Sequence, residues 1–203
     1  MAFFSVSEKR VSLHGKRRGD HLSRGISAVP NANPEDALEA ITPTVRCNGT
    51  PPTPALREGP YYKPDTPLRT NFRSDAEDGV PMLLHGTVLT PDGKPIGGAL
   101  LDFWQVGSEG VYDHDGFRLR GHQFADADGR WRLETVLPAV YPGRTRHVHV
   151  KVQPPGGTVL TTMLYFPGER RNHLDKYFRP ECLMEVRETP EGWDASFTFV
   201  LDV

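Results

Sequence analysis

The sequence predicts an all-β protein: a two-sheet β-sandwich with long loops and an irregular N-terminal arm that contains one short helix. Two observations support this fold class. The 203 residues include 20 glycines and 19 prolines, and so many turn formers are typical of β architecture rather than of helix bundles. From Met82 onward, short apolar stretches also alternate with turns of Gly, Pro and Asp. Because every sheet must bury one face, we expect these strands to pack as a sandwich.

Seven strands are expected in this part of the chain. The first two lie within residues 82–106, on either side of a turn at Pro91–Gly93, and the others cover residues 130–136, 147–153, 158–166, 182–188 and 195–203. Two long loops, residues 105–128 and 166–181, interrupt the strands. In a compact domain such loops usually have a function, so we expect them to form an active site.

Residues 1–57 form the predicted arm, and residues 58–203 form the predicted sandwich domain. A short helix is expected over residues 34–41, because Asn33 can cap it and Pro34 suits its first turn. The acidic residues Glu35 and Asp36 favour the positive end of that helix. The arm is a candidate contact for a homo-oligomer.

Charge and hydropathy limit the partners. The net charge is −2, from 24 basic and 26 acidic residues, which argues against nucleic acid as the main partner. No apolar run approaches the about 18 residues that a membrane span needs, so no membrane partner is expected. Polar residues follow "KRRG" at positions 16–19, where a secretory leader would be apolar, so a cytoplasmic location is expected.

The chain has two cysteines, Cys47 and Cys182, which lie far apart in the sequence. Two unpaired thiols of a cytosolic protein are the favoured interpretation, and a disulfide that ties the arm to the C-terminal part is the alternative. A thiolate zinc site is not expected, because no closely spaced pair of cysteines exists.

The stretch "TRHVHVKV" at positions 145–152 has two histidines inside an expected strand. Side chains alternate along a strand, so His147, His149 and Lys151 share one face and the valines between them face the core. A histidine pair of this kind, taken alone, is usually a solvated polar face. It becomes a metal site only if other segments supply ligands.

Two sets of residues could supply those ligands. A ferrous or zinc site of the two-histidine, one-carboxylate type would need Asp102, Asp113 or Asp126. The other oxygen ligands near the pair in the sequence are the phenols of Tyr112 and Tyr141, each of which is more often structural when taken singly.

Four blocks, taken together and in order, carry a family resemblance. They are "EGPYY" (58–62), "GTVLTPDGKPIGGALLDFWQVGSEGVYD" (86–113), "FRLRGHQFADADGRWRLETVLPAVYPGRTRHVHVKV" (117–152) and "LTTMLYFPGE" (160–169). They resemble the intradiol ring-cleavage dioxygenases. The short interval "YPGRTRH" is similar to the compact branch of that family. The block "GTVLTPDGKPIGGALLDFW" is also similar to transthyretin-like sandwiches, so a non-catalytic binding module is an alternative.

The resemblance implies a mononuclear non-haem Fe(III) that is held by Tyr112, Tyr141, His147 and His149. It implies that Tyr141 leaves the metal and accepts a proton from the substrate, and that Arg144 stabilises negative charge. The expected substrates are O2 and a catechol-type aromatic of the catechol, hydroxyquinol or protocatechuate class. The ring would open between the two hydroxylated carbons to a cis,cis-muconate-type product.

The donor set agrees with this metal on chemical grounds. A phenol with a pKa near 10 is a poor ligand unless a strongly charged cation holds it as phenolate, and two such hard oxygens favour Fe(III). By the same resemblance, Pro60 and Tyr61 would line the pocket mouth, and Val106 and Gly107 are further candidates for its wall.

One position departs from the family pattern. Met163 stands where the family usually has glutamine. A glutamine there could bond to Arg144 or to reacting oxygens, and a thioether does this poorly. The metal ligands are all present, so the departure bears on the rate of turnover rather than on metal binding.

Overall fold

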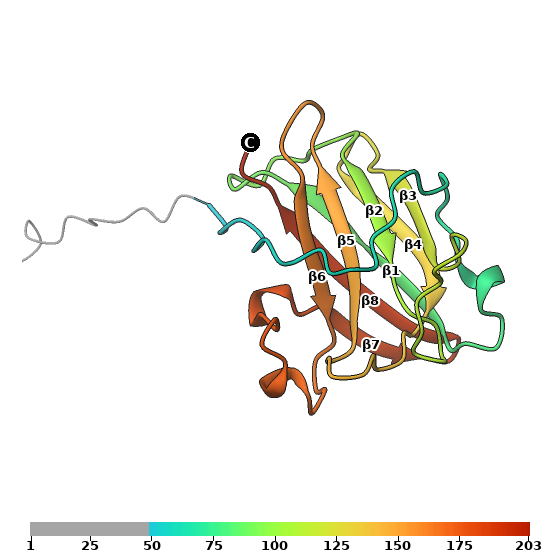
Figure 1. Cartoon of the computed structure of the whole chain (residues 1–203). Helices are drawn as coiled ribbons and strands as arrows, with labels where there is room; N and C mark the ends of the chain where they lie inside the picture. Colours follow the sequence, from blue (N-terminus) through green and yellow to red (C-terminus); the bar gives the residue numbers. More distant parts are fainter. Residues whose placement is uncertain (1–48) are drawn as a thin grey trace, which may run out of the picture. The chain divides into compact units, whose positions relative to one another are not determined.

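The computed structural model describes residues 49–203, which form two four-stranded sheets. The expected helix at 34–41 and Cys47 lie outside the described residues. The first sheet has the order β4-β1-β8-β7, with strands β1 (Pro81–Leu89), β4 (Arg130–Val136), β7 (Glu185–Thr189) and β8 (Gly192–Val200). The second has the order β3-β2-β5-β6, with strands β2 (Leu100–Trp104), β3 (Arg120–Phe124), β5 (His147–Gln153) and β6 (Leu160–Tyr165). Figure 1 shows the two layers, and the predicted all-β sandwich is confirmed.

The core lies between the sheets and follows the alternation of the strands. In β5, Val148, Val150 and Val152 are fully buried, as the sequence predicts. In β1, Leu84 and Val88 face them from the other layer and are also fully buried. Each such side chain contributes about 1.5–3 kcal/mol on burial, so these strands are fixed in register by the core.

The middle of β1 approaches its neighbour so closely that only glycine fits. Gly86 pairs with Phe197 of the parallel strand β8 and with Trp131 of β4. A Cβ added at Gly86 would lie 1.8 Å from the carbonyl oxygen of Phe197. The glycine therefore sets the spacing at the centre of the first sheet.

The prediction that residues 105–128 form one uninterrupted loop is wrong, because strand β3 lies within that range. Its sequence, "RGHQF", has neither alternation nor β-branched residues, so it gives no strand signal. Pairing with β2 and a bridge between Leu68 and His122 hold it in place. A Cβ at Gly121 would lie 2.8 Å from the Phe72 ring. The segment that contains Phe72 can therefore pack directly on β3 only because residue 121 is a glycine.

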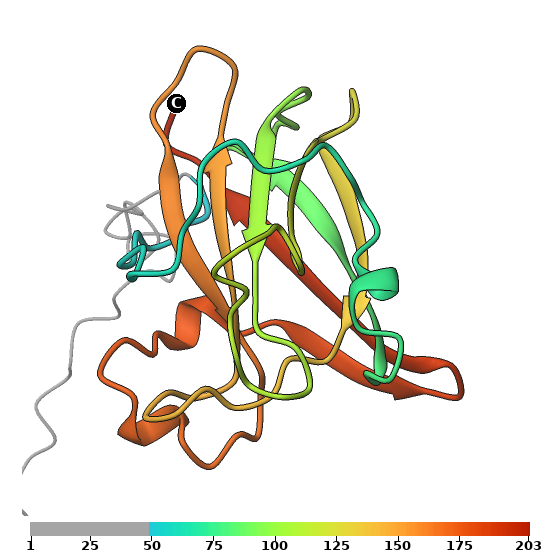
Figure 2. The same ribbon diagram turned by 45° about the vertical axis from the view of Figure 1, so that its right-hand side comes forward.

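The segment before β1 crosses the outer face of the second sheet from β6 to β3 (Figure 1 and Figure 2). Its backbone is anchored where the Leu56 N–H donates to the Thr161 carbonyl at 2.7 Å and the Thr53 N–H donates to the Val200 carbonyl at 2.9 Å. Short 3-10 helices lie at η1 (Arg73–Asp75), η2 (Asn172–Leu174) and η3 (Pro180–Cys182). In the part of the chain that the structure describes, no helix has the length and apolar character that crossing a membrane requires.

Candidate functional site

The two histidines of β5 lie under loops and not on a wet face. His147 and His149 point away from the valine core, yet each is only 3% exposed. The β2–β3, β4–β5 and β6–β7 loops gather at one end of the sandwich in Figure 2 and bring other side chains to this end of the sheet. Tyr112 comes from the first of these loops and Tyr141 from the second.

Three donor atoms converge above β5. His147 Nε2 lies 3.2 Å from His149 Nε2 and 3.4 Å from the Tyr112 hydroxyl. Ligands that share one metal ion at bond lengths of about 2.1 Å are themselves about 3.0–3.4 Å apart. Both distances from His147 Nε2 therefore match the spacing of ligands to a single ion.

The histidine rings are fixed in the orientation and charge state that metal binding needs. The Nδ1–H of His147 can donate to the Thr145 carbonyl at 2.7 Å, which leaves the Nε2 lone pair directed at the donor cluster. The His149 ring stacks on Trp104 with centroids 4.7 Å apart. Burial lowers the pKa of His147 to about 4 and that of His149 well below its ordinary value, so both rings are neutral at pH 7.

The two tyrosines differ in their surroundings. Burial raises the pKa of Tyr112, so its hydroxyl stays protonated unless a cation binds beside it. Tyr141 is less buried, and its hydroxyl lies 2.6 Å from the hydroxyl of Tyr61, a contact that raises the pKa of Tyr141. Tyr61 in turn stacks on Tyr112 at 4.7 Å. The structure thus brings Tyr141 to the wall beside the cluster, with its hydroxyl turned toward Tyr61.

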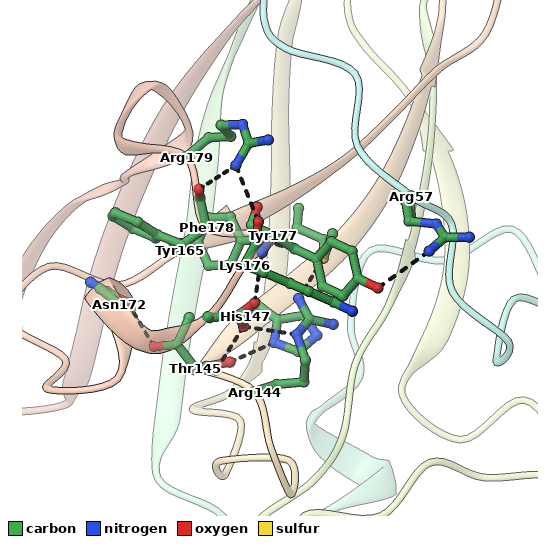
Figure 3. A network of polar contacts seen from close by, with 12 residues as sticks. Arg57, Arg144, Thr145, His147, Tyr165, Asn172, Lys176, Tyr177, Phe178 and Arg179 are labelled. Atoms are coloured by element: carbon green, nitrogen blue, oxygen red, sulfur yellow. Dashed lines mark hydrogen bonds and ion pairs between the residues drawn. The ribbon is translucent and has the colours of Figure 1, made fainter.

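Arg144 is held beside the cluster by a buried carboxylate that the sequence did not indicate. Its Nε donates to Asp175 Oδ2 at 2.7 Å, and the same oxygen accepts the Thr145 N–H at 2.9 Å. The far end of the guanidinium donates to the sulfur of Met163 at 3.2 Å and lies over the Tyr177 ring at 4.9 Å. Figure 3 shows Arg144 between Thr145 and Tyr177. Asp175 thereby fixes the direction of the guanidinium.

Arg120, at the start of β3, cross-links two segments of the site. It is 1% exposed and forms no ion pair with a carboxylate of residues 49–203. Its guanidinium donates to the backbone carbonyl of Tyr61 at 2.6 Å and to that of Asp113 at 2.9 Å. The same group lies 5.9 Å from the centre of the Tyr112 ring and adds positive potential there.

A cavity of about 720 Å³ opens over the donor cluster. Seven of the predicted site residues line it: Pro60, Tyr61, Tyr112, Tyr141, Arg144, His147 and His149. Met163 is also on the wall, and so are five residues that sequence reasoning missed: Arg57, Glu58, Gly59, Pro142 and Tyr177. Glu58 and Gly59 are the first two residues of the "EGPYY" block and Arg57 precedes it, so that block was the available signal for them.

Two candidates lie off this wall. Val106 is 2% exposed and packs in a cluster with Trp104 and Tyr112. The Gly107 carbonyl accepts hydrogen bonds from the N–H groups of Gly110 and Ala139, so Gly107 joins the β2–β3 and β4–β5 loops and does not line the cavity.

The carboxylates of the two-histidine, one-carboxylate alternative are engaged elsewhere. Asp102 accepts hydrogen bonds from Thr66 and Tyr62. Asp113 and Asp126 each accept backbone N–H bonds within their own turns. Within residues 49–203, no three His, Cys, Asp or Glu side chains gather in a group that could hold a metal ion. The donor set that the structure offers is two imidazoles and phenols.

Comparison with known proteins agrees with this donor set. A family model described as "Dioxygenase" matches residues 57–202. The catechol 1,2-dioxygenase of Candida albicans is 34% identical over 135 residues, which cover 53% of this chain and 45% of that protein. The chain belongs to the intradiol ring-cleavage dioxygenases. Enzymes of this family generally use non-haem iron, and the non-catalytic binding module is not favoured.

Further relatives bear on the extent of the match. The hydroxyquinol 1,2-dioxygenase of a Rhizobium species is 30% identical over 158 residues, which cover 64% of this chain and 51% of that enzyme. The chain spans about half the length of the curated relatives that it matches.

Two solved structures show how far the fold is shared. The first is the dioxygenase domain of a dioxygenase carbohydrate-binding fusion from Streptomyces sp. SirexAA-E. It is 54% identical, has a TM-score of 0.74, and is matched over 75% of this chain and 99% of that chain. The second is the catechol 1,2-dioxygenase of Pseudomonas arvilla C-1, which is 28% identical, has a TM-score of 0.68, and is matched over 74% and 62% of the two chains. The sandwich of this intradiol family member therefore has a close counterpart that is itself a single domain.

The buried residues fit iron. Neutral imidazoles with free Nε2 atoms and a phenol that ionises only beside a cation are the ligands that a ferric ion selects. His149 Nδ1 is buried and has no hydrogen-bond partner within residues 49–203, so the stack on Trp104 rather than a hydrogen bond to Nδ1 orients this ring.

Proposed function

We propose that this chain is an intradiol dioxygenase that uses mononuclear non-haem Fe(III) and O2 to open a catechol-type ring between its two hydroxylated carbons. The observation that carries the proposal is the convergence of His147 Nε2, His149 Nε2 and the Tyr112 hydroxyl at the base of an aromatic cavity. Tyr141, on the wall of the same cavity, would complete the ligand set. The product would be of the cis,cis-muconate type.

The residues of the chain divide the work by position. Tyr112, Tyr141, His147 and His149 would hold the ferric ion, which would supply the Lewis-acid chemistry that keeps phenols ionised and activates a catechol ring toward O2. The Tyr141 oxygen is placed to receive a substrate proton, and the Tyr61 hydroxyl at 2.6 Å can hold that oxygen away from the cluster once it is protonated. Arg144, fixed by Asp175, faces the cavity and would stabilise negative charge that develops on the ring.

The wall of the cavity supports an aromatic substrate. Tyr61, Tyr112 and Tyr141 present their rings, and Pro60 and Pro142 add apolar surface. Flat aromatic surfaces orient a ring and limit water at the reacting carbons.

The test is spectroscopic and chemical. The purified chain, loaded with ferric iron, should show the intense visible colour of a ferric tyrosinate and should take up one O2 per catechol with formation of a muconate. Catechol, hydroxyquinol and protocatechuate should be compared under the same conditions. A chain that stays colourless after ferric loading, or that yields no ring-opened product from any of the three, would contradict the proposal.

A further inference from the structure

A second hollow adjoins the mouth of the cavity. It has a volume of about 480 Å³ and is lined by Ala55, Leu56, Arg57, Lys176, Tyr177 and Arg179. Arg57 and Tyr177 line both hollows, so the two meet at this pair. The Arg57 guanidinium donates to the Tyr177 hydroxyl at 3.3 Å, a contact drawn in Figure 3.

The second hollow is strongly positive. Three of its six lining residues are cations and none is a carboxylate. Within residues 49–203, neither Arg57 nor Lys176 nor Arg179 forms an ion pair, whereas Arg144, the other arginine that lines the cavity, is paired with Asp175. The described residues therefore leave the positive charge of the second hollow without a carboxylate partner.

The three cations are also oriented by their neighbours. Arg179 donates to the backbone carbonyls of Lys176 and Phe178, and the Lys176 ammonium lies 4.9 Å from the centre of the Tyr177 ring (Figure 3). Hydrogen bonds from Arg57 and then from Lys176 lower the pKa of Tyr177. Such an arrangement favours an anion at this place.

The position of the charge limits where an anion sits on the substrate. Of the three cations, only Arg57 lines the cavity above the donor cluster, and Lys176 and Arg179 lie beyond Tyr177 in the second hollow. A carboxylate attached directly to the bound ring would stay in the first hollow. A carboxylate on a short side chain could extend past Arg57 and Tyr177, which line both hollows, toward Lys176 and Arg179.

We propose that the substrate is a catechol with a carboxylate at the end of a short side chain, such as a dihydroxyphenyl-propanoate or -propenoate. The ring lies over Tyr112, His147 and His149, and the carboxylate binds to Arg57, Lys176 and Arg179. This inference rests on the proposed function, because the ring must bind at the donor cluster.

The experiment compares one acid with its neutral analogue. The iron-loaded full chain is supplied with 3-(3,4-dihydroxyphenyl)propanoate or its methyl ester, and kcat/KM is measured for each by O2 uptake, with catechol as a reference. We expect the acid to be favoured about tenfold, because several exposed ion pairs each contribute a small factor. The preference should shrink in raised salt.

Variants assign the preference to the second hollow. In the triple variant Arg57→Gln, Lys176→Gln and Arg179→Gln, the ratio of acid to ester should fall toward one. The matched control is Arg73→Gln, because Arg73 is also an exposed cation without an ion pair in the described residues, and it lies at η1 away from both hollows. That variant should keep the wild-type ratio.

The outcomes separate this inference from the proposed function. The inference about an anionic side chain is overturned if the wild-type ratio of kcat/KM for the acid to that for the ester is one or less. It is also overturned if the triple variant leaves this ratio unchanged. In both cases the cleavage of catechol, and with it the proposed function, is unaffected. A dependence on the three cations that is as large for protocatechuate as for the extended acid places the carboxylate on the ring and also overturns this inference. No colour and no cleavage of any catechol would instead refute the proposed function itself.

Discussion

Asp175 offers the sharpest test of how the site is assembled. Its side chain is 2% exposed, and it accepts the Arg144 Nε at 2.7 Å and the backbone N–H groups of Thr145 and Tyr177, each at 2.9 Å. The substitution Asp175→Asn keeps the size of the side chain but removes the charge and one acceptor oxygen. The Arg144 guanidinium would then lose its charged partner, and its contacts with the sulfur of Met163 and the Tyr177 ring are uncharged.

The size of the effect follows from the lost bond. A hydrogen bond between charged partners contributes about 1.5–3 kcal/mol, and Arg144 is only 18% exposed, so solvent screens it little. If that energy positions the guanidinium for the reaction, kcat/KM for catechol should fall about 10- to 150-fold. Iron content and the position of the visible band should stay as in the wild type, because Asp175 touches none of the proposed ligand atoms.

The control is Asp194→Asn. Asp194 is also a partly buried carboxylate, which pairs with His85 and Arg187 at 3.3 Å, but it lies in β8 of the other sheet. Its loss should change kcat/KM by less than about twofold. Wild-type kcat/KM in Asp175→Asn would refute the reasoning, and so would a loss of iron colour, because the defect would then lie in the ligands rather than in Arg144.

The lowered pKa of Asp175 predicts that the free energy of unfolding depends on pH. Burial tends to raise the pKa of Asp175, but the N–H groups of Thr145 and Tyr177 and the Arg144 guanidinium outweigh this and hold it below the ordinary 3.8. The stabilisation from this carboxylate is therefore present above pH 3.8 and is lost as the pH falls through the lowered pKa. Urea unfolding of the wild type and of Asp175→Asn should differ near neutral pH and converge in acid.

Three further changes test the ligands, the departure from the family pattern and the fold. Tyr112→Phe should abolish the ferric tyrosinate band measured by visible absorption, and an unchanged band would exclude Tyr112 as a ligand. Met163→Gln should give Arg144 a carbonyl acceptor in place of a thioether and raise kcat about fivefold, since a neutral hydrogen bond contributes about 1 kcal/mol; an equal or lower kcat in a folded variant would show that the sulfur is no handicap. Gly86→Ala should destabilise the chain by about 1–3 kcal/mol in chemical unfolding, because its Cβ would meet the Phe197 carbonyl, and a wild-type midpoint would contradict that close approach.

The sequence predicted the parts of the fold that the core dictates. The valines of β5 alternate with polar residues. In a sandwich only one face of such a strand can pack against the other sheet, so the valines must face the core. Strand β3 was not predictable in this way, because its pairing with β2 and the fit of Gly121 under Phe72 hold it, and neither leaves a periodic pattern.

The sequence likewise predicted some residues of the site and missed others. Tyr112, Tyr141, His147 and His149 were assigned by the order of motifs, and the structure places all four at one cavity. Their roles as ligands remain a prediction. Asp175, which directs Arg144, is 31 residues away from it in a loop without any repeated pattern. Long-range partners of that kind depend on how a loop returns to the sheet, and local sequence does not record this.

The buried guanidinium of Arg120 matters for any exchange of segments between this chain and a relative. It donates hydrogen bonds to the carbonyls of Tyr61 and Asp113, so it joins the segment before β1 to the loop that contains Tyr112. A graft that replaces either segment alone would put a foreign backbone opposite one of these two hydrogen bonds, and the buried guanidinium would lose a matched acceptor. The segment before β1, the loop that contains Tyr112 and Arg120 therefore form one structural unit. A graft meant to change the substrate range should move all three together.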